Sequence, residues 1–174
     1  MKLKNLKLFL IAGSLLCFAL LLLIVSAFAF YWNTDKNGHE QPIAFSHRKH
    51  VSELGIDCAF CHLYPDKSPR AEVPPVQKCI DCHAFIATEK PEIKKLLGYW
   101  ERKESVPWVK IYFMPDHVYF SHKRHVLKGI DCSVCHGDVK TMEKIIKVYS
   151  LNMGWCVSCH RSKNAPLDCY TCHK

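Results

Sequence analysis

The sequence predicts a chain in two parts: one long N-terminal apolar helix, then a mostly irregular region of short helices and long loops. Two observations support this. Residues 8–32 contain no charged residue. In the rest of the chain, ten of the eleven cysteines fall in one short pattern, Cys-x-x-Cys-His, which occurs five times. So dense a pattern leaves few residues from which to build an ordinary apolar core.

The apolar segment is long enough to cross a membrane. As a helix, residues 8–32 would span roughly 37 Å, against about 30 Å for the hydrocarbon core of a bilayer. Tyr31 and Trp32 fit an interfacial anchor at its end. The positive-inside rule places the N-terminus in the cytoplasm and the rest of the chain outside it, since three lysines precede the segment: Lys2, Lys4 and Lys7.

A cleavable signal peptide is the alternative for this segment. Ala27 and Ala29 frame a small-x-small sequence that resembles a cleavage site. However, the apolar run is longer than the usual signal-peptide core of about 7–15 residues. A lipoprotein signal is disfavoured because Leu16, rather than a small residue, precedes Cys17. We therefore predict a retained transmembrane anchor over residues 1–32.

The repeated pattern is the attachment site for haem c. Two thiols add to the vinyl groups of the porphyrin, and the adjacent histidine becomes the proximal ligand of the iron. Zinc sites do not need a histidine after each cysteine pair, a redox motif would occur once, and a disulfide framework would show varied spacings. The sequence thus predicts five covalent haems c on the motifs Cys58, Cys61 and His62; Cys79, Cys82 and His83; Cys132, Cys135 and His136; Cys156, Cys159 and His160; and Cys169, Cys172 and His173.

An internal repeat sets the organisation of the haem-binding part. Residues 45–62 read FSHRKHVSELGIDCAFCH and residues 120–136 read FSHKRHVLKGIDCSVCH, which agree at eleven positions if one residue is inserted. Similarity at this density indicates two related units. We predict a first unit at 33–83 with two haems, a linker or insertion at 84–116, and a second unit at 117–174 with three.

Six histidines lie outside the motifs, and five distal ligands are needed if every iron is six-coordinate. Two pairs with a spacing of three residues can each face one side of a helical turn. His117 would complete the set, which leaves His39 over. A thioether ligand from Met142 or Met153 stays open as an alternative, because methionine also ligates haem iron. The predicted distal ligands are His47, His50, His117, His122 and His125.

The paired histidines upstream of a motif resemble the class III multihaem cytochromes c. In that family the first histidine ligates the haem just downstream and the second reaches a different haem. The resemblance implies that His47 serves the haem on Cys58 and Cys61, and that His122 serves the haem on Cys132 and Cys135. It also implies that His50 and His125 each bridge to another haem.

Charge and composition exclude some functions. The formal net charge is +8, but two propionates on each haem would bring the loaded protein to about +3 oxidised or about −2 reduced. A nucleic-acid partner is therefore not expected, and no Gly-rich phosphate loop or catalytic triad is present.

In the linker, Pro91 predicts the start of a short helix that ends near Gly98. Residues 108–113 (WVKIYF) would form either a strap over a haem or, less simply, a docking surface.

Residues 107–126, 129–137 and 153–161 resemble the membrane-anchored multihaem cytochrome subunit of bacterial alternative complex III and its relatives, the quinone reductase complexes. The resemblance implies an electron-transfer subunit that is not itself an enzyme. Its partners would be an iron–sulfur/molybdopterin-like subunit, integral quinol-binding subunits, and a soluble cytochrome or oxidase as acceptor. Electrons would pass from quinol through the haems, although relatives also feed electrons toward quinone.

Two other functions stay open. A free-standing membrane quinol dehydrogenase would feed periplasmic reductases; some of these carry Met two residues after the first proximal histidine, whereas Tyr64 stands there in this chain. A multihaem enzyme would need an iron without a distal ligand, which the six spare histidines disfavour.

Overall fold

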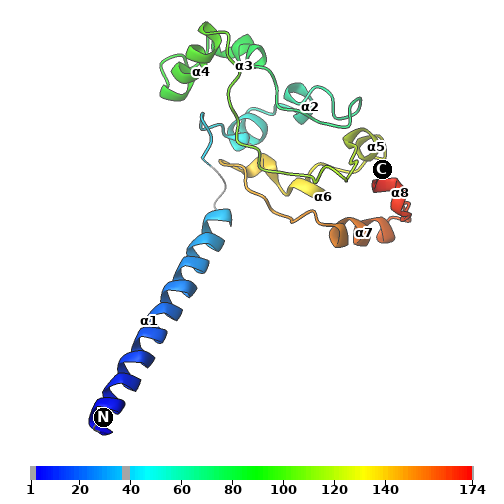
Figure 1. The fold of residues 1–174 in the computed structure, drawn as a ribbon. Helices are drawn as coiled ribbons and strands as arrows, with labels where there is room; N and C mark the ends of the chain where they lie inside the picture. Colours follow the sequence, from blue (N-terminus) through cyan, green and yellow to red (C-terminus); the bar gives the residue numbers. More distant parts are fainter. Residues whose placement is uncertain (1–2, 37–39, 174) are drawn as a thin grey trace. The chain divides into compact units, whose positions relative to one another are not determined.

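The computed structural model describes residues 3–36 and 40–173. The chain divides into two compact units, Met1–Gly38 and His39–Lys174, which we call the N-terminal unit and the C-terminal unit. Figure 1 shows helices joined by long irregular segments, and no β-strand occurs in residues 3–36 or 40–173. The predicted fold class, mostly irregular with short helices and one N-terminal apolar helix, is confirmed.

The N-terminal unit is a single helix, α1 (Leu3–Lys36). Its stretch Phe9–Tyr31 is long and apolar enough to cross a membrane, which agrees with the segment 8–32 expected from sequence. By length and composition alone, such a helix near an N-terminus is either an anchor or a signal sequence. The Ser14 and Ser26 hydroxyls donate to the carbonyls of Ile11 and Leu22 in the same helix. The polar groups of both serines are thus satisfied within the helix.

Each motif of the C-terminal unit lies on or overlaps a helix of its own: α2, α3, α6, α7 and α8 in chain order. Three of these helices are only four residues long, so they do little more than present two cysteines and a histidine. The regular elements of this unit are η1 (Lys49–Glu53), α2 (Cys58–Cys61), α3 (Val76–His83), α4 (Pro91–Glu101), α5 (His122–Leu127), α6 (Ser133–His136), η2 (Val139–Thr141), α7 (Met153–Ser162) and α8 (Cys169–Cys172).

An aspartate before the first cysteine starts three of the motifs. Asp57 and Asp168 are N-cap residues whose carboxylates accept the backbone N–H of Ala59 and Thr171, at 2.8 and 3.0 Å. Asp131 likewise accepts the N–H of Ser133 at 2.8 Å. An N-cap acceptor satisfies an N–H group that the first turn of a helix leaves free. The aspartates therefore let turns this short form next to the cysteines.

The protein's own apolar core is small and lies around the second motif. Among the described residues only Ile43, Ile80, Leu96 and Val106 are buried hydrophobics, and they bring α3 and α4 together. The predicted helix start at Pro91 is confirmed, and α4 continues past Gly98 to Glu101. A domain of this size normally buries much more apolar surface.

The first copy of the repeat is one residue longer than the second, and the extra residue is accommodated within one helical turn. In the second copy the histidine pair lies on the α-helix α5, whereas in the first it runs into η1, a π-helix. A π-turn accommodates one extra residue. Both copies then realign: the His50 carbonyl accepts from Ile56 N–H at 3.0 Å, and the His125 carbonyl accepts from Ile130 N–H at 3.1 Å.

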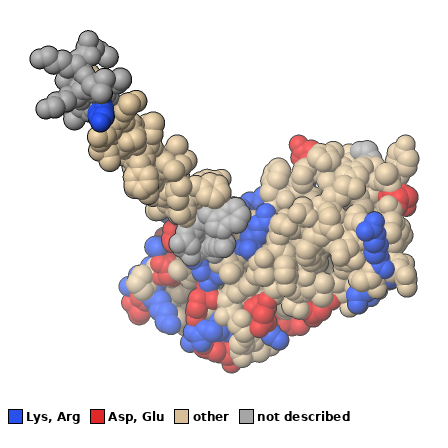
Figure 2. Space-filling model, turned by 90° about the horizontal axis from the view of Figure 1, so that it is seen from below, with Lys and Arg blue, Asp and Glu red and all other residues tan. Residues whose placement is uncertain are grey.

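Charged side chains are mixed rather than segregated. On the face shown in Figure 2, lysine and arginine side chains lie among aspartate and glutamate side chains, beside broad areas that carry no charge. The ion pairs are solvent-exposed; Lys94 with Glu89 and Arg102 with Glu104 are examples. The positive net charge is thus not gathered into one basic patch on this face.

Candidate haem-binding sites

Four of the motif histidines face a distant histidine ring. The ring centroids lie about 6 Å apart in each case, and the two partners come from different segments. The pairs are His50 with His83 at 6.1 Å, His122 with His136 at 6.2 Å, His125 with His160 at 6.1 Å, and His117 with His173 at 5.6 Å.

This separation fits a metal ion between two imidazoles. A metal–imidazole nitrogen bond is about 2 Å long, and the ring centroid lies about 1 Å further, so two rings on opposite sides of one ion stand about 6 Å apart. The same histidines lie closer to the phenylalanine rings beside them: the centroids of Phe45 and His50 are 4.4 Å apart, and those of Phe120 and His125 are 4.6 Å apart. The paired histidines leave room for one atom between them and are compatible with the iron of a haem.

The remaining motif histidine, His62 of the first motif, lies near His47. The pKa of His47 is lowered to about 4, chiefly by burial and also by the nearby His62 and His50 rings. Burial also lowers the pKa of His136, with contributions from His122 and His62. The lowered pKa of each imidazole favours its neutral form, which is the form that binds a metal.

The other ring nitrogen of most of these histidines is fixed by the backbone. In each case Nδ1 lies within hydrogen-bond distance of a carbonyl oxygen, which only accepts, so Nδ1 carries the proton and Nε2 is left with its lone pair. The pairs are His62 with Glu72 at 2.6 Å, His83 with Ile86 at 3.0 Å, His160 with Pro166 at 2.7 Å, His173 with His117 at 3.0 Å, His50 with Ser46 at 2.8 Å, His125 with Ser121 at 2.8 Å, and His122 with Pro69 at 2.9 Å.

Sequence reasoning did not find these acceptors, because a backbone carbonyl carries no side-chain signature. The one usable signal is in the repeat, where Ser46 and Ser121 stand four residues before His50 and His125. His47 differs from these seven histidines. Its Nδ1 is buried and has no hydrogen-bond partner among the described residues.

The thiols of the motifs are free. All eleven cysteines are unpaired, including Cys17 in α1. Among the described residues no three His, Cys, Asp or Glu side chains converge as a metal-binding group. The polar arrangement is instead one of histidine pairs, each beside a Cys-x-x-Cys segment.

The alternative ligands occupy other positions. Met153 begins α7 and is 68% exposed. Met142 follows η2, and its carbonyl accepts the N–H of Arg48 at 3.0 Å. His39 lies outside the described residues. The irregular segment at residues 108–113 is held by Gln41, whose side-chain amide exchanges two hydrogen bonds with the backbone of Val109.

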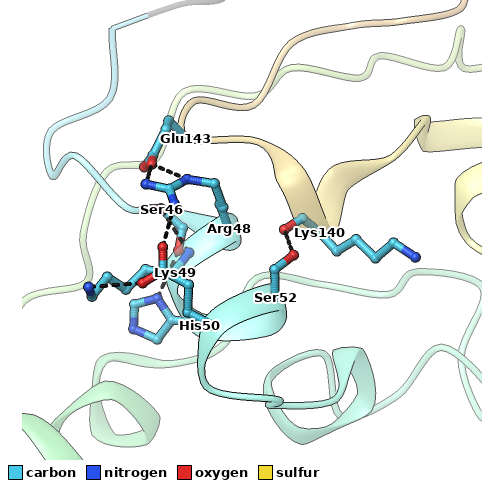
Figure 3. A network of polar contacts seen from close by, with 8 residues as sticks. Ser46, Arg48, Lys49, His50, Ser52, Lys140 and Glu143 are labelled. Carbon is cyan, nitrogen blue, oxygen red and sulfur yellow. Dashed lines mark hydrogen bonds and ion pairs between the residues drawn. The ribbon is translucent and has the colours of Figure 1, made fainter.

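A polar network joins the first histidine turn to the segment after the third motif (Figure 3). The Arg48 guanidinium pairs with both Glu53 and Glu143. The Ser52 hydroxyl donates to the Lys140 carbonyl at 2.6 Å. These contacts connect η1 with η2, so segments almost ninety residues apart in the chain lie side by side.

Comparison with known proteins identifies the class to which the chain belongs. Residues 118–174, which hold three of the motifs, match the family of cytochrome c7 and related cytochromes c. The protein is therefore a multihaem cytochrome c. Over 162 residues it is 30% identical to the multihaem cytochrome c subunit of menaquinone reductase from Nitratidesulfovibrio vulgaris, covering 78% of this chain and 77% of that protein. The chain belongs to the family of that subunit.

Proposed function

We propose that this chain carries five haems c and passes electrons through them as one subunit of a membrane menaquinone reductase complex. The observation that carries the proposal is the separation of 5.6–6.2 Å between the rings of four histidine pairs. The family of the chain and the electron-transfer role of its relatives support it.

Each haem would be held by one motif and one distal histidine. The bound iron supplies one-electron redox chemistry, and the chain's residues fix its position and potential. The proposed pairs of axial ligands are His62 with His47, His83 with His50, His136 with His122, His160 with His125, and His173 with His117.

Two imidazoles on every iron leave no position for a substrate. Such haems exchange electrons without binding what they oxidise or reduce. The Nδ1–H bonds to carbonyls orient the rings and raise the basicity of the ligands. The chain would therefore act as a carrier within a larger enzyme rather than as the enzyme itself.

The membrane position follows from α1 and from the chemistry of covalent haem. We propose that α1 is a retained anchor and that the C-terminal unit lies on the extracytoplasmic side. In keeping with the resemblance to alternative complex III and its relatives, the partners would be an iron–sulfur/molybdopterin-like subunit and integral subunits that bind the quinone. The name of the Nitratidesulfovibrio relative favours electron flow toward menaquinone.

A second candidate is a free-standing quinol dehydrogenase in which α1 alone reaches the quinone pool. Purification from the native membrane in mild detergent, followed by mass spectrometry and assays with menaquinone and menaquinol, separates the two. Co-purifying iron–sulfur and polytopic subunits are expected. A chain that elutes alone while menaquinol reduces its haems would overturn the complex and establish the dehydrogenase.

A further inference from the structure

We infer that the haems form one unbranched chain whose order differs from the order of their motifs: second, first, third, fourth, fifth. The haem on Cys79 and Cys82 and the haem on Cys169 and Cys172 are then the two ends, through which electrons enter and leave. The inference rests on the proposed function for the presence of five haems, and on contacts between motifs for their order.

The second and first sites adjoin. His47 and His50 lie three residues apart on one turn, and their rings go to His62 and His83 respectively. One turn of backbone thus serves two irons. The contact between the motifs is direct, because the Lys78 ammonium lies 3.7 Å over the ring of Phe60.

The third and fourth sites adjoin in the same way. His122 and His125 lie on α5, and their rings face His136 and His160 at 6.2 and 6.1 Å. The repeat therefore builds two pairs of sites with the same local geometry.

The junction between the pairs runs from the first site to the third. The Pro69 carbonyl, in the loop after the first motif, accepts both the backbone N–H of His122 at 3.0 Å and its Nδ1–H at 2.9 Å. The Lys123 N–H donates to the Ser68 carbonyl at 3.1 Å. A second contact is the ion pair of Figure 3, between Arg48 in the first histidine turn and Glu143 in the segment after the third motif.

The thiols at this junction also meet. Burial raises the pKa of Cys132, and the Cys58 thiol of the first motif adds to the increase through its charge and a hydrogen bond. The second motif has a different environment, because its helix α3 packs against α4 around Ile80 and Leu96. The second site is therefore at an end, and the first site is inside the chain of haems.

The fifth site continues from the fourth. The chain folds back after α7, where Ala165 N–H donates to the His160 carbonyl at 2.8 Å, and only eight residues lie between His160 and Cys169. His117 and Tyr119 bind the last motif: the His117 carbonyl accepts Nδ1–H of His173, and the Tyr119 N–H donates to the Cys172 carbonyl at 2.8 Å. The path α3, α2, α6, α7, α8 can be followed in Figure 1.

The direct test is an electron cryo-microscopy map of the purified haem-loaded protein in its native complex, after a pyridine haemochrome assay has counted the haems. We expect the nearest-neighbour irons to be second–first, first–third, third–fourth and fourth–fifth, with partner cofactors beside an end haem. Five haems in another order would overturn this inference and leave the proposed function standing. Fewer than five haems would overturn both.

A kinetic test uses the double variant Cys58→Ser/Cys61→Ser, which removes the first haem. If that haem is internal, its loss separates one haem from the other three, so a donor at either end rapidly reduces one or three of the remaining four. If the order followed the sequence, the first haem would be an end, and rapid reduction of all four or of none would overturn the inference. A matched Cys79→Ser/Cys82→Ser variant should show the all-or-none result.

Discussion

The two copies of the repeat, residues 45–62 and 120–136, place equivalent histidines in equivalent geometry from different backbones. In the first copy the pair runs into a π-helix and in the second it lies on an α-helix. Yet His50 and His125 both donate Nδ1–H to the carbonyl four residues back, at 2.8 Å. Both also face a partner histidine at 6.1 Å. The constraint is the position of the rings, and the backbone adapts to it.

The copies differ where the rest of the protein meets them. His122 donates through Nδ1 to the Pro69 carbonyl, which belongs to the loop after the first copy. The Nδ1 atom of the equivalent His47 is buried and has no hydrogen-bond partner among the described residues. A hydrogen bond at Nδ1 makes an imidazole a stronger electron donor. Equivalent ligands from the two copies of the repeat can thus give their irons different potentials.

Replacing a distal histidine should have the largest effect. His47→Ala and His122→Ala should each convert one of the five proposed low-spin haems to high-spin, because each removes one axial ligand. Low-temperature EPR and visible spectra report the change. His39→Ala is the matched control and should leave the spectra as they are. An unchanged low-spin signal in His122→Ala would disprove that ligand assignment.

The glycine shared by the copies comes next. Gly55 and Gly129 have φ of 69° and 71°, and nothing lies within 4 Å of a Cβ added to either. Alanine at either position should therefore cost about 1–2 kcal/mol of unfolding free energy through backbone strain alone. Thermal melts of the two variants should agree. Gly154→Ala, within α7, is the control and should be neutral or stabilising; a loss in one copy only would mean that their turns are not equivalent.

The aspartate before the first cysteine of each repeat copy should contribute less to stability. Asp57→Ala and Asp131→Ala each remove an acceptor for a backbone N–H, at a cost of about 1 kcal/mol. The change is measured by chemical unfolding of the haem-loaded protein. Asparagine at the same positions keeps the acceptor and should retain most of the stability. Equal losses in the alanine and asparagine variants would argue against a capping role.

Replacing Arg48 should have the smallest effect on stability, and this effect should differ between the two copies. Its pairs with Glu53 and Glu143 are about half exposed, so Arg48→Ala should lower the free energy of unfolding only slightly. The equivalent residue of the second copy is Lys123, and Lys123→Ala should change stability little. Added salt should reduce the difference between the two variants. A difference that persists in high salt would point to a packing role instead.

The sequence predicted the fold class and the start of α4 because both depend on local patterns: spaced cysteines and a proline after a polar pair. It also supplied the ten histidines from which the sites are proposed. It did not predict the carbonyl acceptors such as those of Pro69 and Glu72, because these come from loops whose course depends on the whole unit. Nor did it predict the order of the sites, which depends on contacts between motifs more than seventy residues apart.

The ligation of the irons is the central claim. The most direct measurement is the haem count of the purified full chain combined with carbon monoxide binding to its reduced form. Six-coordinate irons with two histidines each predict five haems per chain and no rapidly binding fraction. A rapidly binding fraction of about one-fifth would show an iron with an open position and contradict the assignment of a histidine pair to every haem.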